Sequence, residues 1–299
     1  MPEDAAGIYL RIARLHFELY KLYSELAKRS RGSNPEDLPP IPRDGDAPEN
    51  PRQSGEHPPV MARSFLEQRG FRITNHQDVA EEYRELLPIA RFIANRFEEV
   101  REFLDAFKRV QQNGAPFTLN VGDAPPLKIS SISQLGHLAL EAGLLAKFQY
   151  NRPRRTFFVQ PSRNSYGINF LTGKWLELYV WYLATRHFDA ATIAQSLFSV
   201  QVVLPSGKDF EIDALLWVGE RAIWIEAKTG EFADKLQKLG EVRKQLGIPQ
   251  EDALLVSTLP LNERSRKARE KASGLRIVLL PELEHELARR AVETAGRNP

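Results

Sequence analysis

The stretch Asp209-Phe-Glu-Ile-Asp-Ala-Leu-Leu-Trp-Val-Gly-Glu-Arg-Ala-Ile-Trp-Ile-Glu-Ala-Lys-Thr-Gly230 is apolar over most of its length, yet acids and a lysine stand near its outer ends. Gly219-Glu220 fits a two-residue hairpin loop, with glycine at the first central position as a type II′ turn requires. If Val218 pairs with Arg221 across this loop, the register of both strands is fixed. The sequence therefore predicts a β-hairpin.

The predicted register brings charged residues together: Asp213 lies opposite Glu226, and Glu211 lies opposite Lys228. Opposed residues share a face, with Cβ atoms about 4.5–5.5 Å apart. Two carboxylates at this spacing repel each other, and a divalent cation would compensate them, because hard cations such as Mg²⁺ take oxygen ligands. The alternative is a surface ion pair between Glu211 and Lys228, with the two acids merely solvated. Strict alternation assigns these residues to the core face: Phe210, Ile212, Ala214, Leu216, Ile223, Ile225 and Ala227.

Helices and strands alternate after residue 165. Hydrophobic patterning predicts a helix near 171–187, strands near 194–204, 208–218 and 221–228, a helix near 232–246, a strand at 253–257, a helix at 262–272, a strand at 276–280 and a final helix. This α-β-β-β-α-β order predicts an α/β domain over residues 166–299, with a mixed sheet flanked by helices.

The sequence of the N-terminal half predicts a mainly helical region, and it divides into three segments. Residues 1–30 have apolar side chains at helical spacing and predict an amphipathic helix that docks on another protomer or on a partner protein. Residues 31–59 are rich in Pro, Gly, Asp, Asn and Ser, which favours a flexible linker. Residues 60–165 form the third segment, a helical region.

Within this helical region, a long helical pattern is expected to break near Pro88, and Ser131 with Gln134 has the form of a capping box that opens a second helix. The run Lys147–Gln160 predicts a hairpin with a basic tip. Together these elements suggest a winged-helix-like domain for substrate binding or regulation.

The charged hairpin resembles a known pattern. Glu211-Ile-Asp213 followed by Glu226-Ala-Lys228 is similar to the motif of the PD-(D/E)xK nuclease superfamily, with Ile212 in place of the usual proline. The preceding helix has, at Glu177, the acid that many members carry. The run Gly173-Lys-Trp-Leu-Glu-Leu-Tyr-Val180 makes the C-terminal part most similar to the nuclease module of CRISPR-associated CARF-fused effector nucleases.

This resemblance covers residues 166–299 and implies a restriction-endonuclease-like fold. It does not extend to the CARF sensor domain, so activation by cyclic oligonucleotides does not carry over. It implies that Asp213, Glu226 and the backbone carbonyl of Ala227 hold Mg²⁺ or Mn²⁺, with Glu177 joining directly or through water. Such an ion lowers the pKa of bound water and neutralises charge on the scissile phosphate.

The implied role of Lys228 is to orient the attacking water or to stabilise the transition state, and Glu211 either tunes this lysine or only pairs with it. The catalytic set that the resemblance implies is Glu177, Asp213, Glu226 and Lys228.

A basic segment lies between Glu141 and Glu177, where the sequence has no acidic residue. Its basic residues suit a phosphate backbone, and the interleaved Tyr150 or Phe157 would stack on bases. The alternative is a solvated basic loop beside an acidic partner domain. The candidate nucleic-acid contacts are Lys147, Arg152, Arg154, Arg155, Arg163 and Lys174.

Composition narrows the class of protein. The 299 residues contain no cysteine, which excludes disulfides and thiolate metal sites and fits a cytoplasmic location. The six histidines show no zinc-ligand spacing, and no apolar run is long enough to span a bilayer. The net charge of +2 gives no general argument for nucleic-acid binding.

These observations predict a Mg²⁺- or Mn²⁺-dependent endonuclease that acts on nucleic acid, with DNA favoured over RNA. A role in antiviral defence follows from the resemblance only, and a homodimer is left open. The alternative is a nucleic-acid-binding or assembly protein that keeps the nuclease fold without catalysis.

Overall fold

The computed structural model describes residues 61–77, 83, 85–110, 113–163, 165–188 and 193–295. The expected N-terminal helix over residues 1–30 and the linker over 31–59 lie outside these described residues. Within them, no helix has both the length and the apolar character that a membrane crossing requires.

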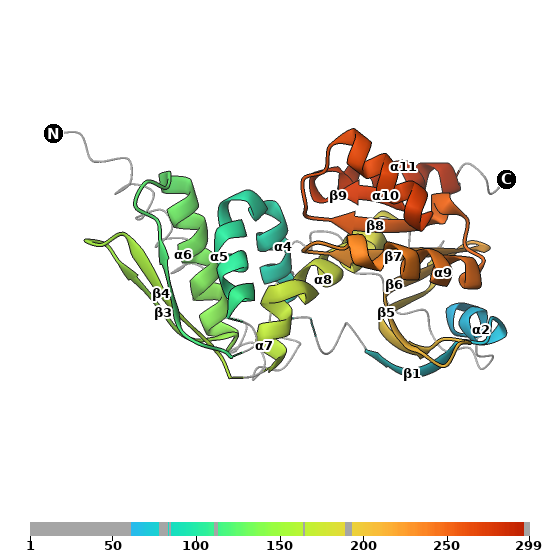
Figure 1. Ribbon diagram of the computed structural model, residues 1–299, viewed down its shortest axis with the longest axis horizontal. Helices are drawn as coiled ribbons and strands as arrows, with labels where there is room; N and C mark the ends of the chain where they lie inside the picture. Colours follow the sequence, from blue (N-terminus) through green and yellow to red (C-terminus); the bar gives the residue numbers. More distant parts are fainter. Residues whose placement is uncertain are drawn as a thin grey trace, which may run out of the picture.

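A six-stranded sheet is the centre of the C-terminal part (Figure 1), in the order β1-β5-β6-β7-β8-β9. The pairs from β1 to β7 are antiparallel, and β7, β8 and β9 are parallel. This mixed sheet confirms the expected α/β class. The edge strand β1 was not predicted. The strands are β1 Arg72–Gln77, β5 Ile193–Val203, β6 Asp209–Val218, β7 Arg221–Lys228, β8 Ala253–Ser257 and β9 Arg276–Leu279.

Each face of the sheet has its own hydrophobic core. One core takes side chains from α4, α5, α6, α8 and α11, and the other takes side chains from α2 and α9. The helix α10 packs on α9 and β9. These helices are α2 Met61–Gln68, α4 Leu87–Asn95, α5 Phe97–Arg109, α6 Pro126–Glu141, α8 Trp175–His187, α9 Leu236–Leu246, α10 Glu263–Ser273 and α11 Leu283–Ala295.

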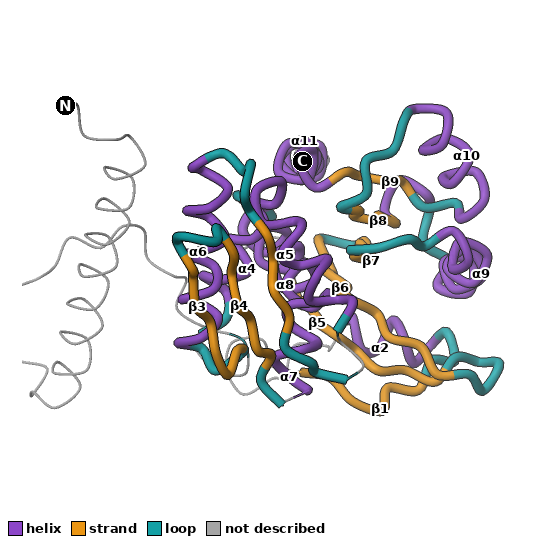
Figure 2. The backbone as a smooth tube through the Cα atoms, turned by 60° about the vertical axis from the view of Figure 1, so that its left-hand side comes forward, coloured by secondary structure: helices purple, strands orange, loops and turns teal. Residues whose placement is uncertain are grey.

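A second, three-stranded sheet lies on the far side of α4, α5 and α6 from the first (Figures 1 and 2). Its order is β2-β4-β3, with β2 Phe117–Asn120, β3 Leu145–Asn151 and β4 Thr156–Pro161. The pairing of β3 with β4 confirms the predicted basic hairpin. Phe148 and Phe157 of this hairpin belong to the same core as the helices that cover the large sheet, so the two parts are continuous.

Two predicted helix boundaries in this region are wrong. The break falls at Arg96, whose φ of −126° separates α4 from α5, while Pro88 lies in the first turn of α4, where a missing N–H costs little. The helix α6 begins at Pro126, five residues before the expected capping box, and Ser131 is buried inside it. A proline at the first helical position was the stronger start signal.

The predicted turn and register of the β6–β7 hairpin are confirmed near the loop. Val218 pairs with Arg221, and the pairing continues to Ala214 with Ile225, where the ladder ends. Gly219 has a φ of +59°, as the first central residue of the turn requires.

The prediction that alternate residues of β6 all face the same core is wrong for the residues before Asp213. Ala214 and Leu216 belong to the core under α8, as expected, but Phe210 and Ile212 belong to the opposite core. Both β5 and β6 change faces at the same level, between the pairs Phe198–Ala214 and Val200–Ile212. Ser199 lies at this level with a φ of +49°, a left-handed conformation that rotates the strand.

We predict that the cost of this conformation is measurable. Ser199→Ala and Ser199→Gly both remove the hydroxyl group, but only alanine resists a positive φ, so Ser199→Ala should be less stable than Ser199→Gly by about 1 kcal/mol. Urea unfolding of the two variants measures the difference.

Ser196, in the same strand and paired with Leu216, provides the control. There the order should reverse, because glycine weakens an ordinary strand by about 0.5–1 kcal/mol relative to alanine. The same order at both positions would contradict the role given to Ser199.

Candidate active site

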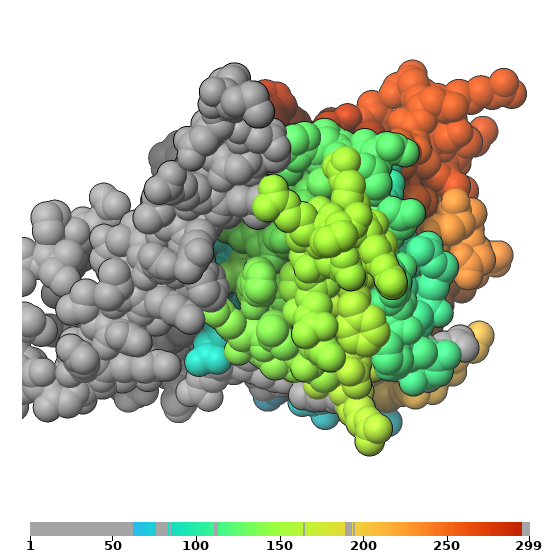
Figure 3. Space-filling model, turned by 90° about the vertical axis from the view of Figure 1, so that its left-hand side faces the viewer, coloured from blue at the N-terminus to red at the C-terminus, as the bar shows by residue number. Residues whose placement is uncertain are grey.

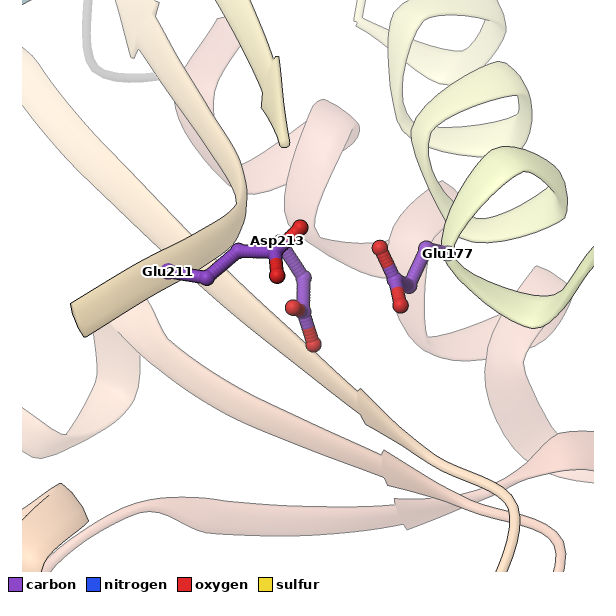
Figure 4. A group of neighbouring side chains, drawn as sticks. All are labelled: Glu177, Glu211 and Asp213. Atoms are coloured by element: carbon purple, nitrogen blue, oxygen red, sulfur yellow. The ribbon is translucent and has the colours of Figure 1, made fainter. Parts of the chain in front are cut away.

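Three carboxylates meet beside the level at which the strands change faces (Figure 4). Glu211 and Asp213 come from β6, and Glu177 points toward them from the first turn of α8. One oxygen of each lies within 4.8 Å of the others. Glu211 was expected to face Lys228, and its place in this cluster was not predicted.

The end of β7 contributes the other part of the site. The Lys228 ammonium donates to Asp213 Oδ2 at 3.1 Å and to Glu226 Oε2 at 2.8 Å. The Ala227 backbone N–H donates to Asp213 Oδ2 at 2.8 Å, and the Trp224 indole N–H donates to Glu226 Oε1 at 3.1 Å. Asp213 and Glu226 are only 5% and 2% exposed, so one ammonium bridges two buried acids.

The structure places Asp213 beside Glu226 and Lys228, and also beside Glu177, so the expected residues meet at Asp213. The three carboxylates whose oxygens are close enough to share one ion are Glu177, Glu211 and Asp213, a group that does not include Glu226. Ala227 is at the site as well, with its amide on Asp213. The expected pairing of Glu211 with Lys228 is wrong, because the change of faces turns Glu211 toward β5 and α8. Its Oε1 accepts hydrogen bonds from Lys174 and from the Ser199 hydroxyl at 2.8 and 2.6 Å.

Lys174 is the second cation of the site. Its ammonium contacts Glu177 Oε2 at 2.7 Å, Glu211 Oε1 at 2.8 Å and Ser199 Oγ at 2.5 Å. Lys174 was expected to contact nucleic acid, but its side chain is 14% exposed and is held among these partners. The sequence did contain a signal for this, since Lys174 lies three positions before Glu177 and such residues share one face of a helix.

A π-helical turn, η1 Phe170–Lys174, joins α7 Ser165–Asn169 to α8. The face that carries Lys174 and Glu177 lies toward the sheet, where Lys174 contacts Glu211. The Thr229 hydroxyl donates to the carbonyl of Thr172 inside this turn at 2.8 Å. The Lys108 ammonium, from α5, donates to the Thr229 carbonyl at 2.5 Å. The residue after Lys228 is thus tied both to the helix that carries Glu177 and to the N-terminal helical region.

Burial and charge crowding change the acidity of the site. Burial raises the pKa of Glu177 to about 8, and the charge of Asp213 adds to this against the opposing effect of Lys174. Burial, again with the charge of Asp213, raises the pKa of Glu226 to about 7 although Lys228 opposes it. Carboxylates crowded in this way tend to hold protons at neutral pH unless positive charge beyond that of the two lysines is supplied.

For the two lysines and for Glu211, neighbouring groups outweigh the effect of burial on the pKa. Burial alone would lower the pKa of Lys174 and Lys228, but the acids around each ammonium raise the pKa above its ordinary value. Burial alone would raise the pKa of Glu211, but hydrogen bonds from Lys174 and Ser199 lower it. Both lysines are therefore charged at neutral pH.

The basic hairpin lies apart from this cluster. Its strands form the outer sheet, whose surface is seen in Figure 3, and the helices α4, α5 and α6 lie between that sheet and the large one (Figure 1). Phe157 is buried, so the expectation that it stacks on bases is wrong. Tyr150 is half-buried against it, with ring centroids 4.6 Å apart. The expected basic residues other than Lys174 are exposed: Lys147, Arg152, Arg154, Arg155 and Arg163.

The fold is similar to that of solved proteins. Protein VC1899 from Vibrio cholerae superposes with a TM-score of 0.56 at 22% identity, over 77% of this chain and 60% of that chain. Can2 from Sulfobacillus thermosulfidooxidans, solved in complex with cyclic tetra-adenylate, gives a TM-score of 0.53 at 17% identity, over 76% of this chain and 60% of that chain. Each likeness is one of fold and spans less than two thirds of the other chain. Neither protein-family models nor curated proteins match the sequence.

The raised pKa values predict a pH dependence of stability. The folded protein holds the Glu177 proton more tightly than the unfolded chain, so this stabilising contribution is present below pH 4.5 and is lost as the pH rises to about 8. In metal-free buffer, Glu177→Gln should gain in melting temperature relative to the parent as the pH is raised from 5 to 8.5. Glu67→Gln, at an exposed carboxylate of α2, is the control and should follow the parent. A constant difference between Glu177→Gln and the parent would contradict the crowding.

Removing the second cation should destabilise the site. Lys174→Met leaves Glu177 and Glu211 without their shared positive charge, and we expect a loss of about 3 kcal/mol in metal-free urea unfolding at pH 8. Adding Glu177→Gln should recover part of this loss. Lys267→Met breaks an exposed ion pair with Glu263 and should cost much less than Lys174→Met. Equal losses for the two lysine variants would show that Lys174 is only a surface residue.

Proposed function

We propose that this chain is a Mg²⁺- or Mn²⁺-dependent nuclease that hydrolyses phosphodiester bonds with a PD-(D/E)xK-type site formed by Glu177, Asp213, Glu226 and Lys228. The observation that carries the proposal is the Lys228 ammonium shared by two buried acids, next to a cluster of three carboxylates. An ordinary ion pair on a surface needs neither the second acid nor the burial.

The donor set fits a hard divalent cation. Its ligands are carboxylate oxygens, and those of Glu177, Glu211 and Asp213 are close enough to share an ion. At full ionisation the four acids of the site exceed its two lysines by two negative charges, which one divalent ion would balance. Asp213, Glu226 and the Ala227 carbonyl, with Glu177, would hold the metal, and Glu211 is an additional candidate. A bound ion supplies a water of lowered pKa and positive charge beside the phosphate.

The chain's own groups have separate roles in this proposal. The Ala227 amide and the Lys228 ammonium fix the orientation of the Asp213 carboxylate. The Lys228 ammonium, which is charged at neutral pH, orients the attacking water or binds the oxygen on which negative charge develops. Lys174 holds Glu177 and Glu211 in place before the substrate arrives.

The fold likeness supports the substrate class. Can2 was solved with a cyclic oligonucleotide, which contains phosphodiester bonds, and it shares this fold. Together with the sequence resemblance to CRISPR-associated effector nucleases, this supports nucleic acid as the substrate class. We propose DNA ahead of RNA and a place in a defence system on the resemblance alone.

The proposal predicts metal-dependent cleavage that needs the hairpin residues. Labelled DNA and RNA oligonucleotides should be cut in the presence of Mn²⁺, and Asp213→Asn or Lys228→Ala should lower the rate at least about 100-fold. Asparagine still accepts a hydrogen bond from the Ala227 amide, so Asp213→Asn removes charge with little change of shape. Mn²⁺ should also raise the melting temperature of the parent and much less that of Asp213→Asn.

Lys267→Ala, at an exposed lysine of α10, should cleave like the parent. Cleavage that is undiminished in Lys228→Ala would point to another site or to a contaminant. No metal effect on melting, together with normal nucleic-acid binding by Asp213→Asn, would favour the non-catalytic binding protein instead.

A further inference from the structure

A cavity of about 450 Å³ adjoins the carboxylate cluster. Lys174, Glu177 and Glu211 line it on the side of the cluster, so its contents would lie next to the reacting phosphate of the proposed function. Its other walls come from α7, the π-helical turn, β5 and Tyr83, which lies before α4. Small-molecule sites in proteins have volumes of about 300–1,000 Å³, so the cavity is large enough to take one nucleobase.

One wall of the cavity is aromatic. Tyr166 is half-buried and lines the cavity together with Tyr83, and the two ring centroids lie 5.7 Å apart with 31° between the planes. Tyr83 is buried and packs in turn on Phe198, at 5.5 Å. The Tyr166 ring is therefore packed against an aromatic neighbour that is itself held in the core, and a ring held in this way loses little freedom when a flat ligand stacks on it.

The remaining walls carry neutral hydrogen-bonding groups. Asn169 and Gln201 contribute amides, and Ser165 contributes a hydroxyl group. Amide side chains have both donors and acceptors and can match the edge of a nucleobase. Among the described residues that line the cavity, the charged ones are Lys174, Glu177 and Glu211, and these pair with one another. The interior thus suits a neutral, flat, hydrogen-bonding ligand better than a phosphate.

We propose that this cavity binds a single nucleobase of the strand whose phosphate lies at the carboxylate cluster. The inference rests on the proposed nuclease function and adds a subsite to it. A base inside a duplex is stacked and paired, so the nucleotide next to the scissile phosphate must be unpaired or turned out of its helix before it enters. Tyr166 stacks on the base, and Asn169 binds its edge.

The test combines protein variants with altered substrates. Single-stranded oligonucleotides with one abasic position, moved stepwise along the strand, are cleaved with Mn²⁺ by the parent, Tyr166→Ala and Asn169→Leu. For intact strands, Tyr166→Ala should raise KM about tenfold, the effect of losing one base–aromatic stack. At the cleavage position that the abasic site weakens, the variant should add no further loss, because the ring and the base act together.

Asn169 is exposed, and leucine keeps its size, so Asn169→Leu tests the site without endangering the fold. Tyr182→Ala, at a half-buried tyrosine of α8 that does not line the cavity, is the matched control and should leave the abasic effect unchanged. Additive effects of Tyr166→Ala and the abasic site, or unchanged KM in both cavity variants, would overturn the subsite while leaving the nuclease function standing.

A binding measurement separates the subsite from catalysis. An oligonucleotide with one 2-aminopurine should lose fluorescence on binding to the parent, and Tyr166→Ala should abolish this loss. Quenching without any cleavage would support the base subsite and contradict the nuclease function. Cleavage that depends on Lys228, without quenching at any 2-aminopurine position, would support the nuclease function and contradict the base subsite.

Discussion

Two buried carboxylates can face each other in their ionised forms only if a positive charge lies between them, and this constraint governs the C-terminal domain. Asp213 and Glu226 are almost fully buried, and the Lys228 ammonium bonds to both. Leaving a buried charge unpaired costs several kcal/mol, so the strand ends that carry these residues must keep their relative positions. The β6–β7 ladder ends at Ala214 and Ile225, and from there side chains take over, since Asp213 accepts the Ala227 amide. The neighbouring Glu177, Glu211 and Lys174 repeat the same arrangement of two acids about one ammonium.

Much of this arrangement could be predicted because it depends on local rules. Gly219 fixes the turn, the turn fixes the register, and the register brings Asp213 and Glu226 together. The order of helices and strands then places Glu177 above them. The change of faces could not be predicted, because it depends on the left-handed conformation of Ser199. A glycine at this position would have indicated a positive φ, whereas a serine does not. The position of Glu211 follows from that change, and it was missed for the same reason.

In the N-terminal half, closeness in sequence did not predict closeness in the fold. Its hairpin was predicted correctly, since alternating aromatic residues flank a polar tip, but the basic tip does not reach the carboxylates. Sequence proximity suggested one continuous surface from Lys147 to Lys174. In the fold, Lys174 turns into the cluster and the hairpin belongs to another sheet. Phe157, which looked available for stacking, is needed in the core.

The hydrogen bonds at Thr229 join parts of the chain that are far apart in sequence. Its carbonyl is bound by Lys108 of α5, and its hydroxyl group binds Thr172 in the turn before α8. No flexible loop lies between Thr229 and Lys228. The hydrogen bonds at Thr229 therefore couple the position of α5 to the end of β7, and the helical region braces this end of the sheet rather than forming an independent module.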